Sequence, residues 1–203
     1  MRLFTGIAIS PHVRGNLARV LKDLRPLAPL NWSPVENLHI TSKFIGDWPD
    51  EQLDELEEAL EQVTPPAPFT IQIARFGYFP NPHNPRAFFA GVHAGPELAQ
   101  LAKQIEDALK PLGIAKEDRP YTPHLTLARI KHEDIRELRE HIAKMTNFDF
   151  GSFTATEYHL YMSKTGPRGS VYSTLATYSL PSNSDSKTPS LPYSPSAPAD
   201  SRD

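Results

Sequence analysis

A short pattern occurs twice in this chain of 203 residues, each time in the same local setting. His39-Ile-Thr41 and His124-Leu-Thr126 each lie in a stretch with the character of a β-strand. Each stretch is followed by a helical pattern with apolar residues at i, i+3, i+7 and i+10. The repetition predicts an internal duplication, with copies at residues 39–63 and 124–145, and therefore two similar lobes related by a pseudo-two-fold axis.

The rest of the chain alternates between strand-like and helix-like patterns, which predicts an α+β fold. Strands are expected at residues 2–10, 38–45, 69–78, 87–93, 124–130, 153–163 and 171–180. Helices are expected at residues 13–24, 50–63, 96–109 and 135–145. Ser33, Pro34 and Glu36 have the pattern of a helical capping box, and residues 80–85 and 165–169 have the composition of turns.

One folded unit is expected at residues 1–180, followed by a disordered tail at 181–203. The tail contains five prolines and seven serines, with Leu191 and Tyr193 as its only sizeable apolar side chains, so it cannot bury enough surface to become ordered. At the other end, the apolar stretch within residues 1–10 is too short for a signal peptide or a membrane span. The protein is therefore expected to be soluble, cytoplasmic and monomeric.

The composition excludes several classes of site. There is no cysteine, which excludes disulfides, thiolate metal sites and cysteine nucleophiles. No pair of histidines has the spacing of metal ligands with a third ligand nearby, so neither a metal nor another cofactor is expected. The 21 basic and 24 acidic residues give a net charge of -3, which argues against a surface that coats nucleic acid but permits recognition of one phosphate in a cleft.

The paired histidines and threonines suggest chemistry at phosphorus. Side chains i and i+2 of a strand lie on the same face, so His39 and Thr41 are expected to share one face, and His124 and Thr126 another. If the two lobes meet about their axis, the pairs line opposite walls of one cleft. Imidazoles titrate near neutral pH, so one can remove a proton while the other delivers one, and threonine hydroxyls can donate to phosphoryl oxygens. A single His-x-Thr would more often be structural, but two equivalent copies favour catalysis.

Further segments extend this pattern into a family resemblance. They are Arg2-Leu-Phe4, Glu36-Asn-Leu-His-Ile-Thr-Ser-Lys-Phe-Ile-Gly46, Arg119-Pro-Tyr-Thr-Pro-His-Leu-Thr-Leu-Ala-Arg129, and the terminal pattern from Leu160 through Ser163 and Gly169 to Tyr172. Together they resemble the 2H phosphoesterases, and among these the RNA 2′,3′-cyclic phosphodiesterases once described as 2′-5′ RNA ligases. The resemblance covers residues 1–180. It implies two pseudo-symmetric lobes of mainly antiparallel sheet, with outer helices and a central cleft that holds both histidines.

The resemblance also implies roles for individual residues. His39 would donate a proton and His124 would accept one as water opens the cyclic phosphate, leaving a 2′-phosphomonoester, although the sequence alone does not assign the two roles. Arg129 would hold phosphate, and Phe44 would stack on a base. Both lie five residues beyond a histidine, an odd offset that turns a side chain to the opposite face unless a bulge intervenes. Core packing for Phe44 and a surface ion pair for Arg129 are therefore the alternatives. Lys43 has the parity of the histidine face, but it lies late in the strand and is expected to be solvated.

Other functions remain open at this point. The same two histidines would serve a 2′-5′ RNA ligase or a phosphodiesterase of small cyclic nucleotides. A non-catalytic module that binds RNA ends would keep the cleft without turnover. A metal-dependent hydrolase would need acidic ligands near the strands, where Glu36 and Asp47 are only flanking.

Overall fold

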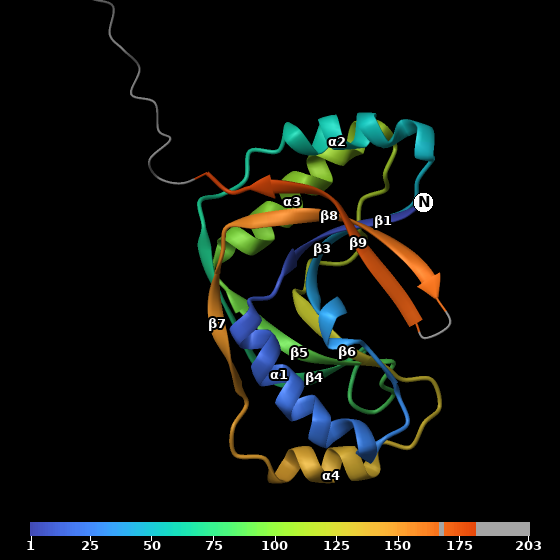
Figure 1. Cartoon of the computed structure of the whole chain (residues 1–203), viewed down its shortest axis with the longest axis vertical. Coiled ribbons are helices and arrows are strands. Elements are labelled where there is room, and N and C mark those ends of the chain that lie inside the picture. The colour runs from blue at the N-terminus through green and yellow to red at the C-terminus, as the bar shows by residue number, and fades with distance from the viewer. Residues whose placement is uncertain (167–168, 182–203) are drawn as a thin grey trace, which may run out of the picture.

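Two antiparallel sheets are built from nine strands in the computed structural model, which describes residues 1–166 and 169–181 (Figure 1). The first sheet has the strand order β3-β1-β8-β9, and the second has the order β2-β6-β5-β4-β7. The strands are β1 Arg2–Ala8, β2 Asn31–Trp32, β3 His39–Asp47, β4 Phe69–Phe79, β5 Ala87–Ala94, β6 His124–Arg129, β7 Asp149–Ala155, β8 Glu157–Gly166 and β9 Gly169–Ser179. The α-helices are α1 Pro11–Leu24, α2 Leu53–Glu61, α3 Pro96–Leu109 and α4 Arg136–Lys144. The α+β fold expected from the sequence is confirmed.

The two sheets repeat the same plan. The order β3-β1-β8-β9 corresponds to β6-β5-β4-β7, and β2 is added outside β6. The first six residues of β3 and of β6 also have the same burial pattern, which in chain order is half-buried, buried, half-buried, buried, buried and exposed. The duplication inferred from the His-x-Thr strands therefore extends to the whole sheet.

The helices cross between the two halves. Helix α1 follows β1 of the first sheet but packs against β7 of the second, while α3 follows β5 of the second sheet and packs against β3 of the first. Figure 1 accordingly shows α2 and α3 at one end of the molecule and α1 and α4 at the other. Because a helix from each half packs on the sheet of the other half, the buried apolar residues of both sheets form one cluster. The relative position of the two sheets is thus set by the crossing connections.

Local sequence signals explain where these helices begin. Ser10 caps α1 by accepting a hydrogen bond from the Val13 amide, and Pro11 occupies the first helical position. The buried face of α1 is formed by Val13, Leu17, Leu21 and Leu24. Helix α3 likewise begins with Pro96 after Gly95. The apolar spacing seen in the sequence is therefore the spacing of the packed face.

Two expectations about local structure were wrong. The strand expected at residues 153–163 is two strands, β7 and β8, which pair with β4 in the second sheet and with β1 in the first. The strand-like pattern is continuous through residue 156, so only the pairing partners divide it. Residues 33–36 do not form a capping box, because Pro34 occupies the capping position of the short 3₁₀ helix Val35–Asn37 and no side chain caps it.

Part of the sequence prediction lies outside the described residues. This applies to residues 182–203 of the expected tail and to residues 167 and 168 of the expected turn. Within residues 1–166 and 169–181, no helix combines the length and the apolar character that a membrane span requires.

Candidate active site

The two histidines are brought together where the two sheets meet. His39 begins β3 and His124 begins β6, and these strands contact each other. The Tyr121 hydroxyl donates a hydrogen bond to the Thr41 carbonyl oxygen at 2.9 Å, which joins the segment before His124 to the strand that carries His39. The fold therefore places the two His-x-Thr strands side by side, although they are separated by more than eighty residues.

Both imidazoles are oriented in the same way. Nδ1 of His39 lies 2.7 Å from the Asn37 carbonyl oxygen, and Nδ1 of His124 lies 2.8 Å from the Thr122 carbonyl oxygen. A carbonyl oxygen only accepts hydrogen bonds, so each Nδ1 must carry the proton. In the neutral form, each Nε2 then has a free lone pair that can take a proton. The carbonyl two residues before each histidine thus selects the tautomer suited to acid and base chemistry.

The threonines differ in their contacts. The Thr41 hydroxyl lies 3.1 Å from Nε2 of His39. Among the described residues, no equivalent hydrogen bond joins Thr126 to His124. Both threonines are half-buried and share a face with their histidine, as the strand geometry predicts. The duplicated scaffold therefore presents two similar pairs whose hydrogen bonding is not identical.

Aromatic rings surround both histidines, which the sequence analysis missed. The His39 ring lies 4.6 Å from the Phe4 ring and 5.1 Å from the Tyr172 ring, between centroids. The His124 ring lies 4.8 Å from Phe79 and 5.6 Å from Phe89. Only Phe4 and Tyr172 belong to segments of the family resemblance, so the sequence contained little indication of the two rings beside His124.

This surrounding changes the titration of His39. Burial lowers the pKa of His39, the hydrogen bond to the Asn37 carbonyl opposes that change, and the nearby His124 adds to the lowering. Neutral His39 is therefore favoured in the free protein.

A bulge in each strand removes the parity objection to Phe44 and Arg129. Thr41 pairs with Gly6 and Lys43 pairs with Thr5, so Ser42 is an extra residue in β3. Leu127 is the extra residue in β6, at the same third position after the histidine. Because each strand contains one extra residue, a side chain five positions after the histidine lies on the same face as the histidine.

The surroundings of Phe44 and Arg129 agree with this geometry. Phe44 is 58% exposed, and its ring lies 6.3 Å from the Phe4 ring that contacts His39. Core packing is therefore wrong for Phe44. Arg129 is exposed and forms no ion pair within the described residues, so the surface ion pair is also wrong.

The expectation for Lys43 was wrong as well. Its side chain is 2% exposed rather than solvated, and its ammonium group forms an ion pair with Glu106. The bulge at Ser42 leaves Ser42 and Lys43 as two consecutive buried residues. As to metals, the described residues contain no group of three or more His, Asp or Glu side chains placed to hold an ion.

Solved structures share this architecture. A protein of Thermus thermophilus superimposes with a TM-score of 0.77 and 29% identity, covering 90% of this chain and 100% of that one. Escherichia coli LigT complexed with 3′-AMP superimposes with a TM-score of 0.72 and 24% identity, covering 88% of this chain and 97% of LigT. The LigT likeness shows the fold alone.

Sequence comparison identifies the family. Residues 12–167 match the model of the 2′-5′ RNA ligase superfamily. The RNA 2′,3′-cyclic phosphodiesterase of Archaeoglobus fulgidus is 33% identical over 178 residues, which is 88% of this chain and 99% of the relative. The enzyme of that name from Methanocaldococcus jannaschii is 34% identical over 173 residues, covering 85% and 96%. The chain belongs to the 2′-5′ RNA ligase superfamily, so the resemblance drawn from the sequence is confirmed.

Proposed function

We propose that this protein hydrolyses the 2′,3′-cyclic phosphate at RNA ends to a 2′-phosphomonoester, with His39 and His124 as the acid and base and without a metal ion. The observation that carries the proposal is the pair of imidazoles, in each of which a carbonyl oxygen holds the proton on Nδ1, so that Nε2 is the atom available to exchange a proton with the substrate. The names of the relatives, RNA 2′,3′-cyclic phosphodiesterase, support the same activity. The cysteine-free chain is compatible with a reducing cytoplasm, where we propose that it acts as a monomer.

The reaction needs one proton removed and one delivered. Water gives a proton to Nε2 of His124 as its oxygen bonds to phosphorus, and the bond from phosphorus to O3′ breaks on the opposite side. His39 protonates the departing O3′, so the products are a 2′-phosphate and a 3′-hydroxyl. The hydroxyls of Thr41 and Thr126 donate to the non-bridging oxygens as charge develops on them. Solvent then restores the two histidines to their starting protonation states.

A proton donor must be charged, whereas the free protein favours neutral His39. The anionic phosphate resolves this conflict, because a negative charge beside an imidazole raises its pKa. We expect NMR titration to find the pKa of His39 below its ordinary value in the free protein and higher when a nucleoside 2′-monophosphate is bound. His132, which is exposed, serves as the internal control. A His39 pKa that does not change on binding would contradict the donor role.

Phe44 and Arg129 give the substrate a direction. They occupy equivalent places after the two bulges, yet one offers an aromatic face and the other a cation. In our proposal Phe44 stacks on the base of the terminal nucleotide and Arg129 holds phosphate. The symmetric scaffold therefore binds an asymmetric ligand in one orientation.

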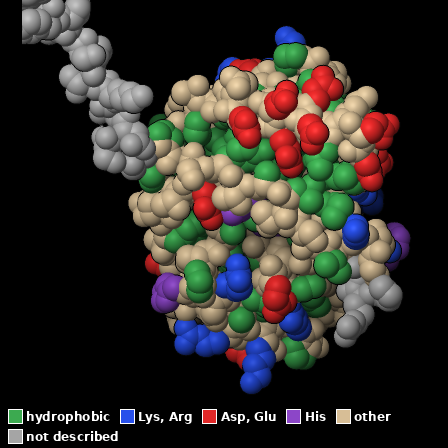
Figure 2. Space-filling view, turned by 45° about the horizontal axis from the view of Figure 1, so that its top comes forward, with side chains coloured by type: hydrophobic (Ala, Val, Ile, Leu, Met, Phe, Trp, Pro, Cys, Tyr) green, Lys and Arg blue, Asp and Glu red, His purple; other side chains and the backbone are tan. Residues whose placement is uncertain are grey.

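The surface charge supports recognition of an RNA end rather than of a long strand. Residues 50–61, which include α2, contain seven acidic side chains and no basic one. Figure 2 shows Asp and Glu side chains gathered in the upper part of the view, with Lys and Arg side chains mostly in the lower part. An RNA backbone would be repelled by the acidic end. We therefore propose that the rest of the strand leaves the site away from α2.

The test uses an oligoribonucleotide that ends in a 2′,3′-cyclic phosphate. We expect complete conversion to the 2′-phosphomonoester in the presence of a chelator, identified by comparison with 2′- and 3′-phosphate standards. The same oligonucleotide with a linear 3′-phosphate is the control and should not react. Loss of activity in chelator, restored by added metal, would contradict metal-free catalysis.

The family name supports one second activity, 2′-5′ ligation. In that reaction the 5′-hydroxyl of another RNA takes the place of water as the nucleophile, and the same two histidines transfer the protons. Adding an RNA with a 5′-hydroxyl to the incubation tests this directly. A longer product resistant to ribonucleases that need a 3′-5′ linkage would reveal ligation.

A further inference from the structure

The two crossing connections of this duplicated fold are held in different ways. The first, between α1 and β3, contains β2, which pairs with β6, and the Ser33 amide donates a hydrogen bond to the carbonyl of the bulge residue Leu127 at 2.8 Å. The second, residues 113–123 between α3 and β6, contains no strand. Backbone pairing thus fixes the connection that leads to His39, but not the one that leads to His124.

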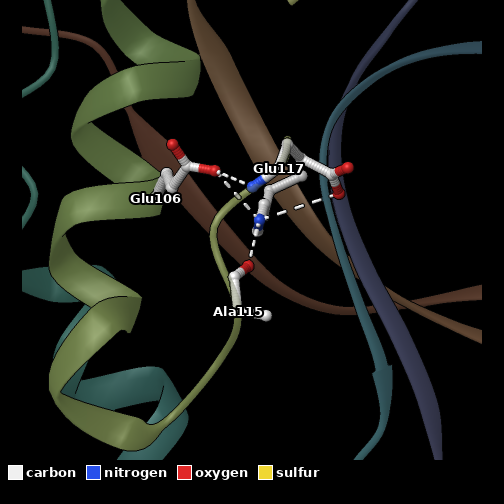
Figure 3. A network of polar contacts seen from close by, with 4 residues as sticks. Glu106, Ala115 and Glu117 are labelled. Carbon is white, nitrogen blue, oxygen red and sulfur yellow. Dashed lines mark hydrogen bonds and ion pairs between the residues drawn. The ribbon is translucent and has the colours of Figure 1, made fainter. Parts of the chain in front are cut away.

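A buried lysine holds the second connection instead. The Lys43 ammonium donates hydrogen bonds to the Ala115 carbonyl oxygen at 2.7 Å and to Oε1 of Glu106 at 3.1 Å, and it lies 3.7 Å from Oε1 of Glu117. Glu106 Oε1 also accepts a hydrogen bond from the Glu117 amide at 2.7 Å. Figure 3 shows Glu106, on α3, and Ala115 and Glu117, on the connection, gathered around this ammonium group.

The charges in this group stabilise one another. Partial burial raises the pKa of Glu106, but the hydrogen bonds from the Glu117 amide and from Lys43, with the charges of Lys43 and Lys116, bring it below its ordinary value. Glu106 is therefore ionised at neutral pH and forms a charge-assisted contact with the buried ammonium.

The position of Lys43 in β3 relates this contact to catalysis. Lys43 directly follows the bulge residue Ser42 and lies two residues beyond Thr41, whose carbonyl accepts the hydrogen bond from Tyr121. Tyr121 lies three residues before His124. Ala128, at the equivalent place in β6, is fully buried and cannot form such contacts. The connection before His124 is consequently bonded to β3 at two places, through the Lys43 ammonium group and through the Tyr121 hydroxyl.

We propose that Lys43 is a positioning residue, which holds the connection before His124 against β3 and so sets the distance between the two histidines during catalysis. This inference rests on the proposed function. It predicts an effect on the chemical step, because small displacements of a positioned acid or base reduce turnover strongly while leaving much of the substrate contact intact.

A pair of variants separates positioning from folding. Lys43→Met removes the ammonium but leaves the Glu106 carboxylate partly buried without its partner, so it is expected to lower the melting temperature. Lys43→Met combined with Glu106→Gln removes that charge and keeps an amide oxygen to accept from the Glu117 amide. We expect the double variant to recover most of the lost melting temperature while kcat remains about 10-fold below wild type and KM changes little.

The control is Lys103→Met on the same helix, where Lys103 forms an exposed pair with Asp107. It should leave melting temperature, kcat and KM unchanged. NMR signals of the His124 imidazole should shift in the double variant, whereas those of exposed His132 should not. Recovery of kcat together with the melting temperature, or unchanged His124 signals, would overturn the positioning role. If wild-type protein fails to open the cyclic phosphate, the proposed function falls, and the His124 signals still test the position of the connection.

Discussion

Replacing either His39 or His124 by alanine is expected to lower kcat on a 2′,3′-cyclic phosphate substrate by about 10²-fold to 10⁴-fold, the usual contribution of a general acid or base. The double variant should be little worse than either single variant. Both imidazoles act in the same transition state, so loss of one already prevents the concerted proton transfers, and the second loss adds little. Steady-state kinetics of the three variants, with circular dichroism to verify folding, makes the measurement.

The matched control is His132→Ala, since His132 is exposed and its contact to Glu133 uses the backbone amide rather than the ring. It should retain wild-type kcat. Full turnover in either His39→Ala or His124→Ala would refute the two-histidine mechanism, even though the family assignment would stand. Additive losses in the double variant would instead show that the two residues act in separate steps.

The second large effect is expected for the threonines. Thr41→Val and Thr126→Val should each lose about 1 to 3 kcal/mol of transition-state stabilisation, as expected when one donor to a charged oxygen is removed. The loss should be greater for Thr41→Val, because the Thr41 hydroxyl also contacts Nε2 of His39 at 3.1 Å. Measurements of kcat/KM for both variants give these free energies directly.

Serine variants provide the control for this prediction. Thr41→Ser and Thr126→Ser keep the hydroxyl and remove only a methyl group, so they should stay close to wild type. If the valine variants retained wild-type kinetics, the hydroxyls would have no role at phosphorus. Equal losses in the serine and valine variants would point to packing of the methyl group instead.

Much of the site follows from the sequence because it depends on local geometry. Side chains at i and i+2 share a face in any strand, so the pairing of His39 with Thr41 and of His124 with Thr126 needed no knowledge of the fold. The apolar spacing after each pair gave helices α2 and α4, and the repetition of the whole unit gave two related lobes. These inferences involve residues close together in the chain, whose relative positions the backbone restricts.

Other features depended on strand register. The bulges at Ser42 and Leu127 arise from pairing with β1 and β5. Without these bulges, the side chains of Phe44 and Arg129 would lie on the face opposite to their histidines. The continuous pattern from residue 153 to 163 contains no signal that its two parts pair in different sheets. Register is fixed by long-range partners, so no local pattern reveals it.

The family, the α+β class, the duplicated strand and helix units, and the two histidines with their threonines could all be predicted from the amino-acid sequence. The packing of α1 and α3 against the opposite halves, the aromatic rings beside each imidazole, and the burial of Lys43 against Glu106 and Ala115 became known only from the folded structure. The difference lies in the range of the interactions. Periodicity and side-chain direction follow from backbone geometry over a few residues, whereas burial, pKa and the distance between the two histidines depend on groups that only the folded chain brings together.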